Sequence, residues 1–260
     1  MKPTSEKLQK VLARAGLGSR RQIETWIQQG RIQVNQQTVK LGTRVTQTDE
    51  IQIDGRKLTP KTLFTFERQI LCYHKPCGEV STRQDPQGRT TVFERLPPPK
   101  QGRWISVGRL DFNTAGLLLF TTDGELAHRL MHPAYTIERE YAVRILGTVD
   151  TALLNRLQQG VELEDGIARF NQIVDAGGTG ANHWYHVTLN EGRNHEVRRL
   201  WHSQGVTVSR LIRIRFGPIT LPKGLRAGQY RQLDPQAQQR LLHHVGLMPL
   251  ATTPTQKNKR

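Results

Sequence analysis

Apolar residues recur at helical spacing along the first thirty residues of the chain. This spacing predicts a helix over residues 5–15, capped by Ser5, and a second helix that begins at Ser19. Gln22, three residues after Ser19, completes a capping-box pattern. The stretch at 31–54 then alternates between apolar and polar residues and predicts short strands. The apolar positions of the two helices are Leu8, Val11, Leu12, Ala15, Ile23, Trp26 and Ile27.

The rest of the chain alternates between patterns typical of strands and of helices. We therefore expect a small unit at 1–58, a linker at 59–68, a larger unit at 69–243 and a basic, disordered tail at 244–260. A turn at Asp165 and Gly166 joins two further strands within 161–178. The predicted strands are 69–76, 105–110, 138–145 and those within 206–220; the predicted helices are a short one near 92–96, one capped by Thr122 or Asp123 that stops at Pro133, and those at 151–160 and 194–204.

Charge narrows the possible partners of the protein. The 260 residues include 38 Lys and Arg but only 22 Asp and Glu, so the net charge is +16. Such an excess favours a polyanion as partner, and nucleic acid is the commonest one. No apolar run is long enough for a membrane span or a signal peptide, so we expect a cytoplasmic location without a membrane partner. Cys72 and Cys77 match neither a disulfide framework nor a zinc ligand set, and we expect both to be reduced thiols.

The small unit alone carries a net charge of +6 over residues 1–58. Five cations cluster where its two predicted helices meet. An ordinary solvated face is the simpler interpretation, but cations beside the amides at the start of a helix favour a phosphate-binding surface. These cations are Lys10, Arg14, Arg20, Arg21 and Arg31.

Asp111 is the strongest candidate for chemistry in the larger unit. It lies where a loop enters an apolar strand, so its carboxylate is near apolar walls but open on one side, as suits a nucleophile. Taken alone, the residues favour a simpler role, in which Asp111 closes a turn with Asn113. We expect no metal site, because His195 and Glu196 begin an HExxH pattern that Arg199 breaks.

The first forty residues resemble a known RNA-binding module. The segment KLQKVLARAGLGSRRQIETWIQQGRIQVNQQTVK is similar to the small domain named after ribosomal protein S4. This resemblance implies RNA binding and leaves the chemistry of the protein open. The matching positions are Gly18, Ser19, Arg20, Arg21, Gly30, Ile32, Val34 and Asn35.

Four segments of the larger unit resemble, in order and spacing, the motifs of bacterial ribosomal RNA pseudouridine synthases. They are YHKPCGEVST, GRLDFNTAGLLLFTTDGE, REYAVRI and EGRNHEVRRLWHSQGVTVSRLIRIRFG. The resemblance implies an α+β protein: a small N-terminal RNA-binding module of the S4 type and a larger catalytic domain on a mixed, mainly antiparallel sheet. Within the family, the chain looks most like the group that modifies a uridine of 23S rRNA near the peptidyl-transferase centre. The small-subunit 16S rRNA enzyme is the nearest alternative, and a ribosome-assembly factor that binds RNA without modifying it is the alternative from another class.

The resemblance reverses the preference for a simple turn at Asp111. It implies that Asp111 is the catalytic nucleophile, that Tyr141 packs on the target base and that Arg198 is the cation paired with the Asp. His195 departs from the polar or basic residue expected at its position, which puts a local RNA contact in doubt. Without the resemblance, Tyr141 in a strand would be assigned to core packing. The RNA contacts that we assign are Lys10, Arg14, Ser19, Arg20, Arg21, Arg31, Asn35, Arg109, Arg193 and Asn194.

The implied reaction needs no cofactor and no metal, because uridine and pseudouridine are isomers. The bond from the anomeric carbon to the ring nitrogen breaks, the base turns, and ring carbon 5 attaches instead. The carboxylate either attacks covalently or removes the proton beside the anomeric carbon, and the sequence leaves both routes open. A guanidinium beside Asp111 would keep the carboxylate ionised, and the target would have to leave its stack to reach it. We expect a monomer whose partner is ribosomal RNA, namely 23S rRNA in a ribosome-assembly intermediate.

Overall fold

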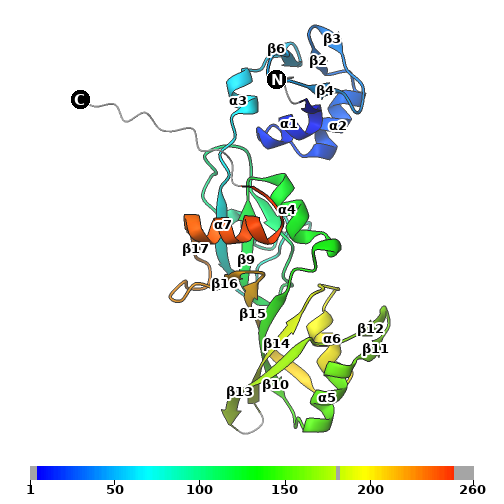
Figure 1. The fold of residues 1–260 in the computed structure, drawn as a ribbon, viewed down its shortest axis with the longest axis vertical. Helices are drawn as coiled ribbons and strands as arrows, with labels where there is room; N and C mark the ends of the chain where they lie inside the picture. The colour runs from blue at the N-terminus through cyan, green and yellow to red at the C-terminus, as the bar shows by residue number, and fades with distance from the viewer. Residues whose placement is uncertain (1–4, 180–181, 249–260) are drawn as a thin grey trace, which may run out of the picture. The chain divides into compact units, whose positions relative to one another are not determined.

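A computed structural model describes residues 5–179 and 182–248, and the chain divides into two compact units (Figure 1). The smaller unit contains the chain up to Gln69 together with Pro97–Ile105 and Thr121–Gly124. The larger unit contains Ile70–Leu96, Ser106–Phe120 and the chain from Glu125 onwards. The division therefore differs from the single boundary region that the sequence predicted at 59–68.

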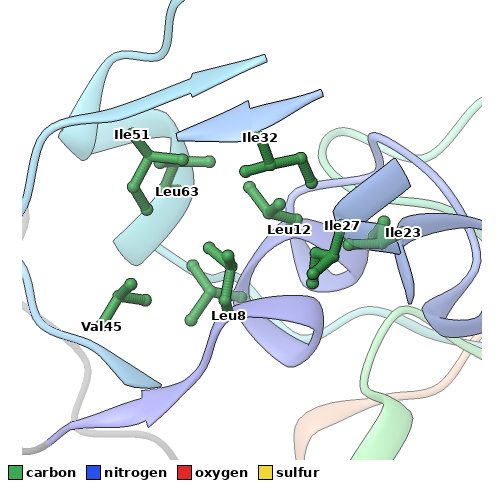
Figure 2. Packing of buried hydrophobic residues seen from close by; sticks show 9 residues of the cluster. Leu8, Leu12, Ile23, Ile27, Ile32, Val45, Ile51 and Leu63 are labelled. Carbon is green, nitrogen blue, oxygen red and sulfur yellow. The ribbon is translucent and has the colours of Figure 1, made fainter. Parts of the chain in front are cut away.

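The smaller unit combines three helices with two small sheets. Four strands form one sheet in the order β3-β2-β5-β6, and β1 pairs with β4 in the other. Figure 2 shows the core, where α1, α2 and α3 meet the strands. The elements are β1 (Glu6–Lys7), α1 (Leu8–Arg14), α2 (Arg20–Gln28), β2 (Ile32–Val34), β3 (Gln37–Thr38), β4 (Arg44–Val45), β5 (Ile51–Ile53), β6 (Arg56–Lys57) and α3 (Pro60–Phe64). The core residues are Leu8, Val11, Leu12, Ile23, Ile27, Ile32, Val45, Ile51 and Leu63.

The ends of these helices differ in part from the prediction. Ser19 caps α2 as expected, since its side chain accepts a hydrogen bond from the Gln22 backbone N–H at 3.1 Å. The first helix begins only at Leu8, and Ser5 does not cap it. The Ser5 hydroxyl instead accepts a hydrogen bond from Arg44 Nε at 3.1 Å. The strand pairing of β1 with β4 therefore takes residues that helical periodicity had assigned to the first turn.

The predicted linker contains a helix that belongs to the smaller unit. Helix α3 spans Pro60–Phe64, and its Leu63 is buried in the same core as Leu8 and Ile51. Pro60 is compatible with this helix, because proline is well tolerated in the first turn of a helix. The linker expected at 59–68 is thus partly helical and partly core.

The larger unit is built on one mixed sheet in the order β13-β14-β10-β15-β9-β7-β17, with β16 paired to β15 and β8 to β9. Only the β9–β15 pair is parallel among the described pairs whose register is known, so the expected mixed, mainly antiparallel sheet is confirmed. Helix α6 packs against β15, and α5 against β13. The elements are β7 (Ile70–Lys75), η1 (Val92–Arg95), β8 (Ile105–Val107), β9 (Ala115–Thr121), α4 (Gly124–Met131), η2 (Pro133–Tyr135), β10 (Arg139–Leu146), α5 (Thr151–Gln159), β11 (Val161–Leu163), β12 (Gly166–Ala168), β13 (Gln172–Thr179), β14 (Asn182–Leu189), α6 (Glu196–His202), β15 (Thr207–Phe216), β16 (Ile219–Thr220), β17 (Tyr230–Gln232) and α7 (Pro235–His244).

The parallel pair brings two backbones very close together. Gly116 of β9 lies opposite Arg213 of β15 and has a φ of +111°. A Cβ atom at this position would lie 2.3 Å from the Arg213 carbonyl oxygen. Only glycine fits here without displacing a strand, and the contact fixes where β9 begins, directly after the loop that carries Asp111.

The first residues of the predicted tail at 244–260 are folded. Helix α7 ends at His244, and Val245 is buried, so both belong to the fold of the larger unit. Residues 249–260, which make up most of the predicted tail, lie outside the described residues.

Candidate active site

A cavity of about 530 Å³ lies in the larger unit, at the end of β9 where the chain enters that strand. Asp111 and Tyr141, which the sequence assigned to catalysis, both line it. Its wall therefore combines the carboxylate and the aromatic ring that the proposed chemistry requires. Other residues of the wall, several of them charged, are Arg109, Arg139, Arg193, Asn194, His195, Glu196 and Arg213.

Asp111 lies in the loop between β8 and β9, and its side chain is 37% exposed. The loop is a turn, because the Thr114 backbone N–H donates to the Asp111 carbonyl at 3.0 Å. Thr114 Oγ1 also lies 3.5 Å from the Asp111 carboxylate. The two roles weighed from the sequence are compatible: the backbone of Asp111 closes the turn, with Thr114 rather than Asn113, while its carboxylate lines the cavity.

Lys75, at the end of β7, stabilises this turn by hydrogen bonds to its backbone carbonyls. Its side chain is fully buried, and Nζ donates to the carbonyl oxygens of Asp111, Thr114 and Pro76 at 3.0, 2.9 and 2.9 Å. Burial lowers the pKa of the Lys75 ammonium. Three carbonyls around one buried ammonium fix the turn, because each would otherwise lose a hydrogen-bond partner in the interior. The sequence did not predict this role, although Lys75 lies within one of the family motifs.

His195 is the ring that faces the Asp111 carboxylate. Its Nε2 lies 3.5 Å from Asp111 Oδ1. The residue has a φ of +50° and directly precedes α6, which begins at Glu196 rather than at the predicted residue 194. The departure from the family pattern at His195 thus falls within reach of the proposed nucleophile, closer to the chemistry than the sequence suggested.

Arg198 does not form the expected ion pair with Asp111 in the described structure. Its guanidinium donates to the carbonyl oxygens of Asn113 and Val208, each at 2.9 Å. The side chain lines a second cavity of about 490 Å³, which His195 also borders. Arg198 therefore ties the Asp111 loop to β15 through backbone carbonyls, and its link to Asp111 is through the position of Asn113.

Tyr141 lies in β10 and is 8% exposed. Its neighbours across the sheet are Val187 of β14 and Arg213 of β15. Because paired residues of adjacent strands project their side chains to the same face, Tyr141 and Arg213 are neighbours in the cavity wall.

Three more charged groups complete this wall, of which Glu196 and Arg213 are buried and Arg139 is half-buried; none was singled out from the sequence. Arg139 donates to the carbonyl oxygens of Ile137 and Asn190, and burial lowers the pKa of its guanidinium. Glu196 is 3% exposed, and burial raises the pKa of its carboxyl to about 7. Arg213 is 2% exposed and donates from Nε to the Leu117 carbonyl at 2.8 Å. The signal for Arg213 was its place in the alternating segment RLIRIRF, where every second side chain faces the core.

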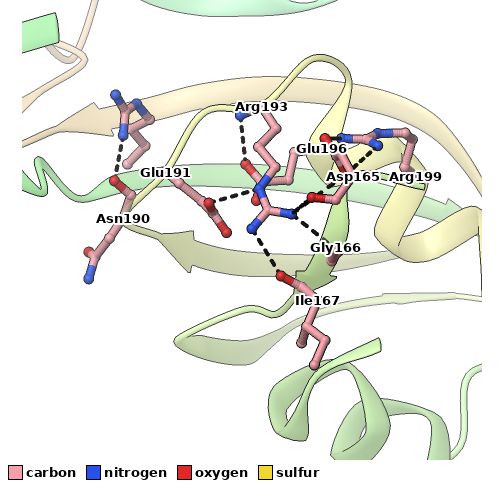
Figure 3. Close-up of polar contacts among 9 residues, drawn as sticks. Asp165, Gly166, Ile167, Asn190, Glu191, Arg193, Glu196 and Arg199 are labelled. Atoms are coloured by element: carbon pink, nitrogen blue, oxygen red, sulfur yellow. Dashed lines mark hydrogen bonds and ion pairs between the residues drawn. The ribbon is translucent and has the colours of Figure 1, made fainter. Parts of the chain in front are cut away.

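Arg193 holds the β11-β12 hairpin to the cavity wall. Its guanidinium donates to the Glu191 carboxylate at 2.9 Å and to the Gly166 and Ile167 carbonyls at 3.2 and 2.9 Å (Figure 3). Arg199 forms a double hydrogen bond with Asp165 of the same hairpin, both at 2.8 Å. The role of Arg193 that the structure shows is thus structural, while an RNA contact by its remaining surface stays a prediction, as do those of Arg109 and Asn194.

The RNA-binding residues predicted in the smaller unit fall into two groups. Arg20 and Arg21 are exposed in the first turn of α2, beside the Ser19 cap, as a phosphate-binding surface requires. The remaining predicted side chains have partners within the unit. Arg14 and Lys10 pair with Glu6, Arg31 with Asp54, and Asn35 donates to Asp49 and accepts from the Glu50 N–H.

No helix among the described residues is long and apolar enough to cross a membrane. The same part of the chain contains no group of three or more His, Cys, Asp or Glu side chains that could hold a metal ion. Cys72 is buried and Cys77 is exposed, and both are free thiols.

Comparisons with known proteins assign this fold and cavity to a class. Residues 69–203 match the RNA pseudouridylate synthase family, and residues 6–51 match the S4 domain. A crystal structure of a pseudouridylate synthase has a TM-score of 0.62 and 28% sequence identity, over 90% of this chain and 99% of that one. The chain belongs to the RNA pseudouridylate synthase family and carries an S4 domain, which confirms both resemblances.

Several relatives with a known name share more than half of their aligned residues with this chain. The ribosomal large subunit pseudouridine synthase B of Pseudomonas aeruginosa is 56% identical over 96% of this chain, which spans 65% of the length of that protein. The proteins of the same name from Yersinia pestis and Escherichia coli K12 are 54% and 57% identical, and the chain covers 81% and 86% of their lengths.

Proposed function

We propose that this protein converts a uridine of large-subunit ribosomal RNA to pseudouridine. The observation that carries the proposal is the cavity in which Asp111 and Tyr141 meet, in a chain more than half identical to the large-subunit enzymes named above. The related small-subunit reaction is the alternative that mapping of the modified position would distinguish.

The geometry supports a division of roles within the cavity. The Asp111 carboxylate, positioned by Lys75 and by the turn with Thr114, acts on the sugar of the target nucleotide, either by covalent attack or by removing the adjacent proton. Tyr141 packs on the target base and holds the detached uracil while it turns. Arg198 acts as a positioning residue through its hydrogen bond to Asn113 in the Asp111 loop.

The rest of the molecule supplies affinity for RNA. Positive charge on both units would neutralise backbone phosphates, and the shape of the RNA would select the site. Arg20, Arg21 and Arg109 are exposed and are the contacts that we favour. The substrate that we propose is 23S rRNA near the peptidyl-transferase centre, in a ribosome-assembly intermediate. The protein would act there as a cytoplasmic monomer without a cofactor.

Substitution of Asp111 by Asn tests the proposal. The Asn side chain keeps the shape but lacks the charge, so Asp111→Asn should still bind RNA but should no longer release tritium from uracil carbon 5 of labelled RNA. Asp175→Asn is the matched control, because Asp175 is exposed in β13 of the same unit and does not line the cavity. Turnover by Asp111→Asn close to that of the control would refute the assignment.

The position of the modified uridine is tested in cells. Ribosomal RNA from a strain without the protein should lose one pseudouridine in the large-subunit RNA and regain it with the wild-type gene. Loss from the small-subunit RNA instead would favour the alternative reaction. An unchanged pseudouridine map would favour the remaining alternative, a ribosome-assembly factor that binds RNA without modifying it.

A further inference from the structure

Arg213 is a buried guanidinium that the roles assigned above do not use. It lines the cavity that Asp111 and Tyr141 share, and it lies opposite Tyr141 in the β10–β15 pair. Only 2% of the residue is exposed. A full positive charge in such a place costs free energy unless it is compensated, and ordinary stability does not require it here.

Arg213 forms one hydrogen bond to the described part of the chain, and its buried Nη2 donor takes no part in it. Nε donates to the Leu117 carbonyl of β9 at 2.8 Å, which fixes the plane of the guanidinium. Its carbon Cζ lies 5.1 Å from the centre of the Phe216 ring, which packs against it. Nη2 is buried and has no hydrogen-bond partner in the described part of the chain. A rigidly held, buried donor without a partner is typical of a group that awaits a substrate atom.

The reaction places negative charge on the base held in this cavity. When the bond between the anomeric carbon and ring nitrogen 1 breaks, its electron pair stays with the uracil. The resulting anion is delocalised over nitrogen 1 and the two carbonyl oxygens. The pair is used again when ring carbon 5 bonds to the anomeric carbon, and carbon 5 then loses its proton. No oxidant or reductant takes part, so the barrier depends strongly on how well the transient anion is stabilised.

We propose that Arg213 is a further catalytic residue, which stabilises the detached uracil anion by donating a hydrogen bond from its guanidinium to a carbonyl oxygen of the base. This inference rests on the proposed pseudouridine synthase activity. Tyr141 holds the ring from the neighbouring strand, and Asp111 acts on the sugar. Arg139 adds a second positive charge to the same wall. The preorganised donor costs no rearrangement when the charge develops.

The test compares two RNA substrates that differ in how well the base accepts negative charge. One carries uridine at the target position and the other 5-fluorouridine, whose fluorine withdraws electrons and makes the detached base a weaker base. Carbon 5 of this base has no proton to lose, so the rearranged ring keeps its fluorine and takes up water at carbon 6. Single-turnover consumption of the target nucleoside, at saturating enzyme, is measured by digestion and mass spectrometry. Arg213→Gln keeps planar N–H donors but removes the charge, and Arg213→Lys keeps the charge but removes the fork. Arg210→Gln is the control, because Arg210 is exposed on the same strand.

Arg213→Gln should slow the uridine substrate about 100-fold, as does the loss of one donor to a developing anion in other enzymes. It should slow the 5-fluorouridine substrate only about tenfold, because less charge then needs stabilisation, while Arg210→Gln leaves both rates near wild type. Equal slowing of both substrates would overturn the inference and leave Arg213 a structural role. If thermal melting shows that Arg213→Gln is unfolded, the slowing of the two substrates is compared for Arg213→Lys instead, and equal slowing of both would again overturn the inference. Failure of the wild-type protein to convert the RNA that carries uridine would instead reject the proposed function itself.

Discussion

Substitution of Gly116 by Ala tests the close approach of β9 and β15 on which the active-site geometry depends. The new methyl carbon would lie 2.3, 2.5 and 2.9 Å from the backbone O, N and C atoms of Arg213. None of these belongs to a flexible side chain, so the two strands would have to separate. The positive φ of Gly116 adds a backbone cost of about 1–2 kcal/mol, and overpacking a well-packed interior adds about 1–3 kcal/mol. We therefore expect the free energy of unfolding of the larger unit to fall by about 2–5 kcal/mol.

Gly205→Ala is the matched control for this prediction. Gly205 also has a positive φ, +75°, but a Cβ there would have no neighbour within 4 Å. Its substitution should cost only the backbone term of about 1–2 kcal/mol. Denaturant titration, with the transition of the larger unit fitted separately, measures both variants against the wild type. A loss for Gly116→Ala no greater than that for Gly205→Ala would refute the reasoning, because the overlap would then have been relieved without cost.

Three further predictions follow from buried groups. Lys75→Met should lower kcat by about 100-fold with little change in RNA affinity, because the Asp111 turn loses its anchor and a misplacement of about 1 Å is costly; single-turnover rates and binding titrations measure the two effects. Leu63→Ala should destabilise the smaller unit by about 2–5 kcal/mol in denaturant titrations, whereas an extended linker at this position would tolerate the change. The pKa of Glu196 is raised by burial from 4.5 to about 7, so its contribution to stability is complete below about pH 4.5 and is lost as the pH rises through 7. Melting temperatures of the wild type should therefore fall relative to Glu196→Gln between pH 5.5 and 8, and a constant difference would contradict the raised pKa.

The sequence predicted those features that depend on local pattern. The Ser19 cap, the strand that carries Tyr141 and the helix at 151–160 follow from side-chain chemistry and periodicity within a few residues. The place of Asp111 in the cavity agrees with the motif resemblance. These features need no knowledge of how distant segments pair.

The features that the sequence missed arise from pairing between distant segments. Arg198 was expected beside Asp111, but the carbonyls of Asn113 and Val208 hold its guanidinium, and a motif cannot show which oxygen a donor will choose. Arg213 lies in the cavity wall because β15, which carries it, pairs with both β9 and β10. The register of those pairs is a property of the folded sheet.

The smaller unit consists of three separate segments of the chain, which limits how the protein can be truncated into domains. Pro97–Ile105 and Thr121–Gly124, which come from the middle of the chain, belong to the same compact unit as the S4 domain. No single cut can therefore excise that unit whole, because truncation after residue 58 would separate both inserted segments from it. The same truncation would also remove Leu63 of α3 from the core. Exchange of this compact unit with that of another enzyme would have to carry three stretches of sequence together, so the unit cannot be transferred as one continuous segment.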